Sequence, residues 1–195
     1  MNLSGALVAE EIARDNIDIA GAYLNMGEAG LEIIMSLYSA ALLRYCHSIL
    51  CDYHEAQDAV QVSFIKAYQS RVKFSGDDKD LANFLYKIAY NTCIDIIRKR
   101  RAVLELFKNE RLKSSNTSAE YMPENLKAAL NMLGVLDRAV IYGHAVEELK
   151  FDELAQIHGK SAVSLRKRYE RARKKLSKIL EKDYIKNKQG VNADE

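Results

Sequence analysis

The chain has 195 residues, with one proline, nine glycines and no tryptophan, and its formal net charge is +2. This length suffices for one domain or for two small ones, each able to bury a core. Long stretches are rich in Ala, Leu, Ile, Lys, Arg and Glu, and they lack the sustained alternation of apolar and polar residues that is typical of strands. This composition predicts an all-helical protein.

The sequence argues against a secreted or membrane-embedded protein. No apolar run approaches the roughly 20 residues that span a bilayer. The N-terminus lacks the charged start and the apolar core of a signal peptide. Three cysteines, an odd number, suit a reducing compartment. We therefore expect a cytoplasmic protein that does not insert into a membrane.

Helical periodicity and turn residues divide the first half of the chain. In chain order they predict a leading helical segment (1–27), a helix (28–50), a short turn (51–54), a helix (55–72), a loop (75–78) and a helix (80–101). Cys46, His47, Cys51 and His54 lie close together there and suggest zinc. In one helix, however, Cys46 and His47 would point about 100° apart, and the spacing matches no common zinc finger. We expect helix-packing cysteines, and we predict no metal and no cofactor.

Residues 102–122 differ from their surroundings. They contain a polar run, Lys113–Ser118, and Pro123 can open the next helix at its first turn. Helical spacing resumes from there to about residue 184, and the tail 185–195 is expected to fray. The fold class that follows is all-α, with two small helical domains (28–101 and 123–184) joined by a flexible linker (102–122).

The segment 148–176 has the layout of a helix-turn-helix. An apolar stripe at helical spacing runs through Leu165, Tyr169, Ala172, Leu176 and Ile179. Gly159 stands where the preceding helix must end in a left-handed conformation. Ser161 stands at the position of an N-cap. In such a motif the second helix enters the major groove of DNA.

Charge is distributed unevenly. Residues 160–178 contain nine Lys or Arg and one acid, whereas residues 1–80 carry twelve acids and six bases. The alternative for the basic helix is a solvated surface face. Solvated faces usually mix charges of both signs, so this one-sided count favours a polyanion as the partner. The acidic and basic parts of the chain are expected to meet different partners.

The helix 80–101 combines aromatic residues with a basic end. Tyr86, Tyr90 and Asn91 precede the tetrad Arg98–Arg101. Aromatic planes beside cations can hold stacked or splayed bases while the cations hold phosphates. The alternative is that the aromatics fill the core and the cations stabilise the helix C-terminus through its dipole. The core interpretation is favoured for Phe84 and less clearly for Tyr86, but four consecutive cations exceed what capping needs.

Three motifs together resemble the bacterial sigma factors. Residues 58–68, DAVQVSFIKAY, look like the family's D-x-V-Q-x-x-F-x-x-A-[WY] helix. Residues 84–95, FLYKIAYNTCID, are similar to its W-L-x-x-I-A-x-N-x-x-x-D segment. The basic helix-turn-helix is similar to its final domain. The resemblance covers roughly residues 30–180, and the lack of a large middle domain fits the extracytoplasmic-function (ECF) subgroup.

The resemblance implies a factor that binds the RNA polymerase core and directs promoter-specific transcription initiation. It implies contact with the polymerase clamp coiled coil through Asp58, Gln61, Phe64 and Tyr68. For the minus-ten element, where a base leaves the stack, it implies contact through Tyr86, Tyr90, Asn91, Asp95, Arg98, Lys99, Arg100 and Arg101. For the minus-thirty-five element it implies contact through Ser161, Ser164, Arg166, Lys167, Arg168, Arg171 and Lys174. The polymerase flap and an anti-sigma factor are further implied partners.

The chain departs from the family pattern in three places. Phe84 stands where the family has Trp, Lys160 replaces an apolar residue of the turn, and Val163-Ser164 replaces the common Gly-Thr. The fold should survive these changes. The resemblance therefore does not carry over which promoter sequence is recognised, because it implies that Ser164 and its neighbours reach the base edges.

Other function classes find less support. There is no Gly-rich phosphate loop and no paired His-and-carboxylate motif, and the four histidines are scattered. We therefore expect no enzyme. The main alternative is a stand-alone helix-turn-helix regulator, which would bind duplex DNA without polymerase. Its first domain would need a ligand pocket or a dimer seam, whereas this one carries the clamp-type helix and the basic tetrad. A regulatory protein that sequesters a partner has no motif in its favour.

Overall fold

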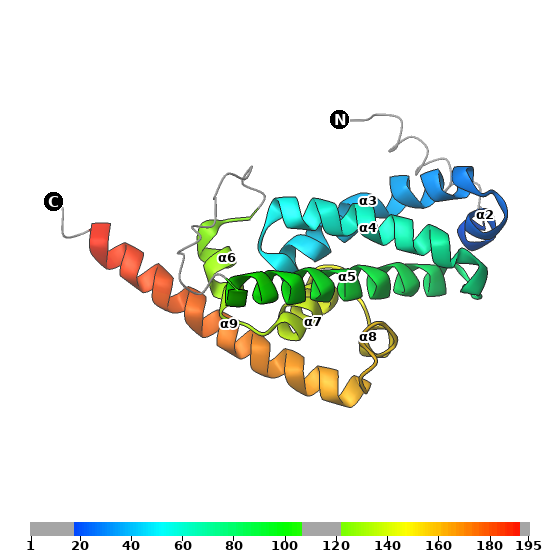
Figure 1. Cartoon of the computed structure of the whole chain (residues 1–195). Helices are drawn as coiled ribbons and strands as arrows, with labels where there is room; N and C mark the ends of the chain where they lie inside the picture. Colours follow the sequence, from blue (N-terminus) through cyan, green and yellow to red (C-terminus); the bar gives the residue numbers. More distant parts are fainter. Residues whose placement is uncertain (1–17, 107–121, 192–195) are drawn as a thin grey trace.

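The computed structural model describes residues 18–106 and 122–191 (Figure 1). Within these ranges every long element is an α-helix, which confirms the all-α prediction. The helices are α2 (Ile19–Asn25), α3 (Glu28–Leu50), α4 (Tyr53–Ser70), α5 (Asp78–Leu106), α6 (Glu124–Asn131), α7 (Val135–Ala145), α8 (Phe151–His158) and α9 (Ala162–Val191), with a 3-10 turn η1 (Arg71–Lys73). Most of the expected N-terminal extension, most of the linker and the end of the tail lie outside the described residues.

Local chemistry sets the helix bounds in the first domain. The predicted helix 28–50 is confirmed as α3, which ends at Cys51 in a left-handed conformation with φ 55°. The Asp52 carboxylate caps α4 by accepting from the Glu55 amide at 2.9 Å. Asp77 caps α5 in the same way, accepting from the Asp80 amide at 3.0 Å. α5 continues to Leu106 instead of ending at 101, because the residues after the cationic run are good helix formers and include no Gly or Pro.

Helices α3, α4 and α5 pack on one another and enclose the core of the first domain (Figure 1). Tyr45, Leu42 and Leu85 are almost fully buried in it. The short helix α2 covers one end of this bundle. The Tyr23 hydroxyl donates to the Ala67 carbonyl at 2.6 Å, and the Ala20 amide donates to Asp78 Oδ1 at 2.7 Å. Residues 18–26 are therefore a structural part of the first domain.

Gly30 allows α2 to approach α3. A Cβ at this position would lie 2.4 Å from the Ala22 carbonyl oxygen and 2.9 Å from Tyr23 Cα. Both are backbone atoms, which cannot move without shifting α2. We expect Gly30→Ala to lower the free energy of unfolding by about 1–2 kcal/mol in urea titrations, since the overpacking outweighs the better helix propensity. A stabilised variant would show that α2 does not pack against α3 in solution.

The second domain consists of α6–α9. Val140, Leu154 and Leu165 form a buried centre where α7, α8 and α9 meet. Leu130 and Leu133 form a second cluster near Leu176 of α9. The long helix α9 thus contributes one apolar stripe to this domain, while its opposite face remains exposed.

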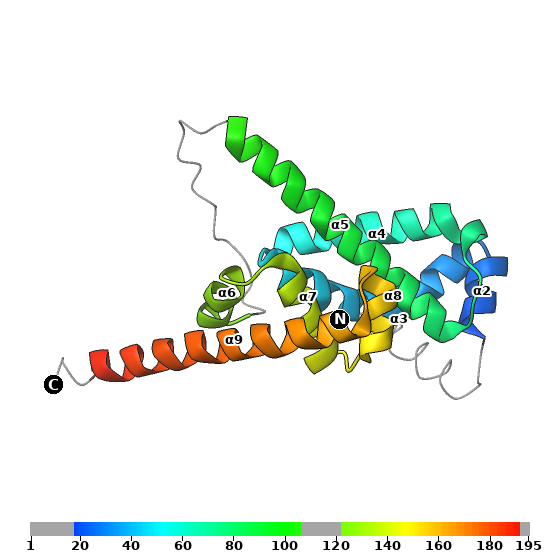
Figure 2. The same ribbon diagram turned by 90° about the horizontal axis from the view of Figure 1, so that it is seen from below.

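The two domains pack directly against each other. α7 contacts α3, and α8 contacts α5. In Figure 1 α5 lies between the other helices of the first domain and the pair α8–α9. Figure 2, seen from below, shows α8 over α5, with which it is in contact. Ala139 and Ile157 of the second domain belong to the same buried cluster as the first-domain core. The sequence predicted two domains but not this shared core.

Contrary to the expectation from the sequence that no apolar run approaches this length, α3 is long and apolar enough, by length and composition alone, to cross a membrane. In the structure, 44% of its most apolar stretch is buried, and the helix contacts α2, α4, α5 and α7. The core helix of a globular protein has these same properties. Packing in the bundle accounts for the buried part of its apolar surface.

Candidate polymerase and nucleic-acid interfaces

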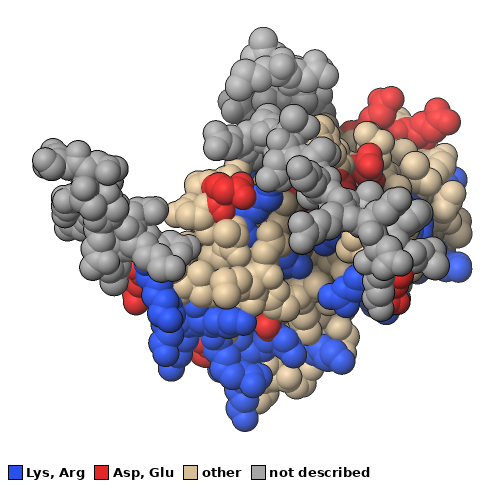
Figure 3. All heavy atoms as spheres, turned by 60° about the vertical axis from the view of Figure 1, so that its left-hand side comes forward, with Lys and Arg blue, Asp and Glu red and all other residues tan. Residues whose placement is uncertain are grey.

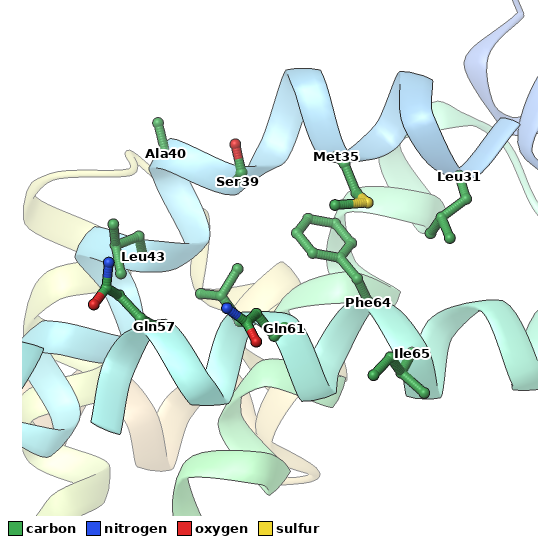
Figure 4. A pocket seen from close by; sticks show the side chains of 10 residues that line it. Leu31, Met35, Ser39, Ala40, Leu43, Gln57, Gln61, Phe64 and Ile65 are labelled. Carbon is green, nitrogen blue, oxygen red and sulfur yellow. The ribbon is translucent and has the colours of Figure 1, made fainter. Parts of the chain in front are cut away.

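An apolar groove runs between α3 and α4 (Figure 4). Its volume is about 580 Å³. The lining residues are Leu31, Met35, Ser39, Ala40, Leu43, Gln57, Val60, Gln61, Phe64 and Ile65. Met35 and Ile65 are 43% and 55% exposed, so the groove presents apolar side chains to solvent. Exposed apolar surface of this kind marks sites where a protein partner binds.

The four residues expected to meet the polymerase clamp take different positions. Phe64 is only 3% exposed and forms part of the groove wall together with the exposed Gln61. Asp58 is exposed on α4, one turn before Gln61. Tyr68 is half-buried, and the Arg71 guanidinium lies 4.2 Å from its ring centre. The structure brings Gln61 and Phe64 together at the groove, with Asp58 beside it.

Tyr86 and Tyr90 of α5 contact side chains of the second domain, whereas Phe84 packs against Phe74. Tyr86 is 4% exposed, packs edge-on against Tyr45, and donates from its hydroxyl to Glu147 Oε2 at 2.8 Å. Burial and the nearby Glu147 carboxylate raise the pKa of Tyr86. Tyr90 is half-buried, and its ring meets the His158 ring edge-to-face at 4.5 Å. Tyr86 therefore belongs to the core, which agrees with the core interpretation of the aromatic residues in this helix.

The basic end of α5 is open to solvent. Arg98, Lys99, Arg100 and Arg101 are all exposed, and so is Asn91. Arg100 pairs with Glu55 at 3.2 Å. Asp95 pairs with Lys66 at 3.2 Å and with Arg98 at 3.9 Å. Exposed ion pairs of this kind contribute about 0–1 kcal/mol each. The tetrad can therefore exchange these carboxylates for phosphates at little cost.

A polar pocket lies at the start of α5, beside the loop that the sequence predicted there. It has a volume of about 310 Å³ and is lined by Lys73, Phe74, Ser75, Asp80, Asn83, Phe84, Lys87 and Gln156. Asp80, Asn83 and Lys87 are spaced by three and four residues, so they share one face of the helix. That spacing was the signal available in the sequence. Gln156, which comes from α8, could not be found in this way.

The helix-turn-helix has the expected turn. α8 ends at Gly159 with φ 62° and ψ 38°, and the Ser161 hydroxyl accepts from the Ser164 amide at 3.3 Å. Both capping predictions are thereby confirmed. Leu165 is fully buried against Leu154 and Val140, which fixes the rotation of α9. Its polar face consequently points to solvent.

The residues expected to read the minus-thirty-five element lie mostly on this exposed face. Ser161, Ser164, Arg166, Lys167, Arg171 and Lys174 are exposed. Figure 3 shows Lys and Arg gathered over α9 in one patch. Arg168 differs, because its guanidinium pairs with Asp137 of α7 at 2.6 Å and is 37% exposed. Arg168 therefore ties α9 to α7 in this structure.

His158 is a buried imidazole at the boundary between the domains. Neither of its ring nitrogens has a hydrogen-bond partner. Burial lowers the pKa of His158 from 6.5 to about 4. The neutral ring is therefore compatible with the fold, and its contribution to stability is present above pH 6.5. That contribution is lost as the pH falls from 6.5 towards 4.

We expect His158→Phe to reduce the acid sensitivity of the fold, because phenylalanine keeps an aromatic ring against Tyr90 but cannot take up a proton. Between pH 7 and 4 the unfolding free energy of the wild type should fall by up to about 3 kcal/mol more than that of the variant. Urea titrations at both pH values measure this difference. Carboxylates titrate in both proteins, so their effect on the unfolding free energy cancels when the two losses are compared. Equal losses in the two proteins would contradict the buried neutral state.

No group of three or more His, Cys, Asp or Glu side chains is placed to hold a metal ion within residues 18–106 and 122–191. Cys46, Cys51 and Cys93 are free, buried thiols. Burial raises the pKa of the Cys51 thiol, against the effect of the neighbouring Arg138 guanidinium. These cysteines pack between helices.

Two family models match the chain in the order of its domains. Sigma-70 region 2 matches residues 34–103, and Sigma-70, region 4 matches residues 124–176. The ECF RNA polymerase sigma factor SigW of Bacillus subtilis is 26% identical over an alignment of 163 residues, and the match covers 75% of this chain and 87% of SigW. The RNA polymerase sigma factor SigV of the same organism is 28% identical over 142 residues. The match covers 72% of this chain and 84% of SigV.

Solved structures agree with this assignment. The sigma factor RpoE from Bartonella quintana, in complex with the anti-sigma factor NepR, superposes with a TM-score of 0.67 at 25% identity, over 77% of this chain and 96% of that chain. CnrH, in complex with the cytosolic domain of CnrY, has the same fold, with a TM-score of 0.66 at 24% identity. The match covers 85% of this chain and 96% of the CnrH chain. The two matched regions together cover more than half of the chain, in the order and spacing that its motifs predicted. The chain belongs to the sigma-70 family, as an ECF sigma factor that directs transcription initiation.

Proposed function

We propose that the three surfaces divide the work of initiation: the α3–α4 groove binds the polymerase core, the α5 face holds the minus-ten strand, and the exposed face of α9 holds the minus-thirty-five duplex. The observation that carries the proposal is the groove. It is apolar and open, Gln61 lines it, and Asp58 is exposed one helical turn before Gln61. Such a groove can hold the apolar face of an amphipathic helix. A sigma factor acts by binding, so we assign no catalytic group. Because its partners are the polymerase and DNA, we place it in the cytoplasm.

The pocket at the start of α5 is proposed to receive a base of the minus-ten element. Asp80, Asn83 and Lys87 supply hydrogen-bond donors and acceptors, and Phe84 supplies an aromatic surface beside them. From there the strand would follow α5 past Asn91 to the basic tetrad 98–101. The cations hold the phosphates, and the pocket selects the base.

On α9, the exposed Arg166, Lys167, Arg171 and Lys174 are proposed to bind phosphates of the minus-thirty-five duplex. Ser164 lies at the N-terminal end of the helix, from which recognition helices contact base edges. Arg168 would act indirectly, by holding α9 against Asp137. The flap of the polymerase would meet the same domain.

An anti-sigma factor is proposed as a further partner. The similar RpoE was solved with the anti-sigma factor NepR. A second groove, with a volume of about 420 Å³, lies between α3, α6 and α7, and it shares Ala40 and Leu43 with the first. The two grooves thus form one apolar surface across both domains. An amphipathic helix seated on it would compete with the polymerase core.

Run-off transcription tests the proposal. Purified bacterial polymerase core with this protein is expected to give discrete transcripts from fragmented genomic DNA, and core alone is not. Mapped start sites would then reveal both promoter elements. If no transcripts appear while the protein alone shifts specific duplexes, the stand-alone regulator is the better interpretation.

A further inference from the structure

Val163 is an exposed apolar residue in the first turn of α9. It is 67% exposed, and it is one of the positions at which the chain departs from the family pattern. Valine is a poorer helix former than alanine, because its branched side chain loses rotational freedom in a helix. An exposed side chain also buries little apolar surface. Val163 therefore contributes little to the stability of the fold.

The packing of α9 determines the direction in which Val163 points. Leu165 is fully buried against α7 and α8, and Val163 precedes it by two residues, which is a rotation of about 200° around the helix. Val163 consequently points away from the core of the second domain. The exposed residues Lys167, Glu170 and Lys174 follow it at helical spacing and lie on the same side of α9. Val163 thus begins a stripe on the face to which the minus-thirty-five duplex is assigned.

Val163 stands among charged residues. Lys160, Arg166 and Lys167 are all exposed and lie within four positions of it. Cations at such positions bind phosphates, whereas side chains at the N-terminal end of a recognition helix contact the base edges. A valine side chain has no hydrogen-bonding group, so it can distinguish bases only by contact with an apolar group. In the major groove, that apolar group is the C5 methyl of thymine.

We propose that Val163 contacts the C5 methyl group of a thymine in the minus-thirty-five element and so selects thymine over cytosine at that position. Cytosine carries a hydrogen at C5 and offers no methyl group. The contact removes the methyl groups of both partners from water, which favours binding. This inference rests on the proposed function, which assigns the exposed face of α9 to the minus-thirty-five duplex.

The test replaces thymine by uracil, which lacks only the C5 methyl group. Promoter duplexes identified by run-off transcription would carry deoxyuridine at one thymine of the minus-thirty-five element at a time. The complex of the full chain with polymerase core is titrated with each duplex. At the position that Val163 contacts, the substitution should lower the affinity about fourfold, as expected for one buried methyl group. With Val163→Ser, the thymine and uracil duplexes should bind equally well there.

Val163→Thr is the matched control for Val163→Ser. Both variants introduce a hydroxyl group, but only threonine keeps a γ-methyl group, so it should preserve the preference for thymine. Both should leave thermal unfolding unchanged, because the side chain is exposed. If Val163 served only to begin α9, Val163→Ser would weaken binding to the thymine and uracil duplexes equally, and the inference would be overturned.

Equal affinity of the wild type for thymine and uracil at every position would also overturn the inference. Promoter-dependent transcription by the wild type would still support the proposed function in both of these cases. The absence of run-off transcripts would instead overturn the proposed function, and the inference with it.

Discussion

Asp58→Arg combined with Gln61→Arg is expected to abolish association with the polymerase core. Both side chains are exposed on α4 beside the groove, and Gln61 lines it. Two long cations there would reverse the local charge and obstruct a helix that enters the groove. A loss of at least about 100-fold in affinity is expected, as for residues central to an interface. Titration of labelled protein with purified core measures it, with circular dichroism as the check on folding.

A matched control adds the same charge elsewhere on α3 and α4, the two helices that form the groove. Glu32→Arg with Gln69→Arg changes two exposed residues of α3 and α4 that do not line the groove. Its affinity for the core should stay close to that of the wild type. Normal core binding by the Asp58 and Gln61 variant would remove the groove from the polymerase interface. Equal losses in both variants would point to long-range charge instead of local contact.

Arg166→Ala combined with Arg171→Ala is expected to weaken binding of the holoenzyme to promoter duplexes. Both arginines are exposed on α9, at the patch seen in Figure 3. Removing two phosphate contacts should lower the affinity about 10- to 100-fold at low salt. It should also reduce the slope of log affinity against log salt concentration by about 2. The difference from the wild type should therefore shrink as salt rises. Titrations of a promoter duplex at several salt concentrations measure both quantities.

Arg168→Ala provides the contrast on the same helix. Because this guanidinium is paired with Asp137 at 2.6 Å and is about two-thirds buried, its loss should lower the unfolding free energy by roughly 1 kcal/mol. The Arg166 and Arg171 variant should lose at most about 0.5–1 kcal/mol, through the contact of the Arg166 guanidinium with the Phe151 ring at 5.2 Å. Undiminished promoter-dependent transcription by that variant would contradict the assignment of α9 as the recognition helix.

Most helices and several of their ends could be read from local sequence, although α5 runs to Leu106 and α9 to Val191, beyond the expected ends at 101 and 184. The bounds of α3, the turn at Gly159 and the cap at Ser161 depend on residues within a few positions of one another. Helical periodicity also placed Leu165 on the buried side of α9 and Arg166 on the exposed side. These features follow from backbone conformation and hydrogen bonds between near neighbours, so a single sequence contains them.

The groove was only partly predictable. The motif of residues 58–68 pointed to Gln61 and Phe64, but the facing wall comes from α3, whose residues Leu31 and Met35 showed only a helical period. Likewise, the spacing of Asp80, Asn83 and Lys87 puts them on one face, but it does not say that η1 and α8 complete a pocket. A surface formed by two elements requires their relative rotation, which periodicity alone does not supply.

The sequence by itself determined an all-helical chain, the helix-turn-helix and the basic face of α9, because each depends on local periodicity and charge. The tertiary structure alone decided that Tyr86 is buried, that Arg168 is paired, and that Gln156 and His158 lie on α5. These outcomes depend on contacts between residues 31 to 73 positions apart. Apolar burial and polar pairing across such separations are set when the helices dock, and no local pattern encodes which faces will meet.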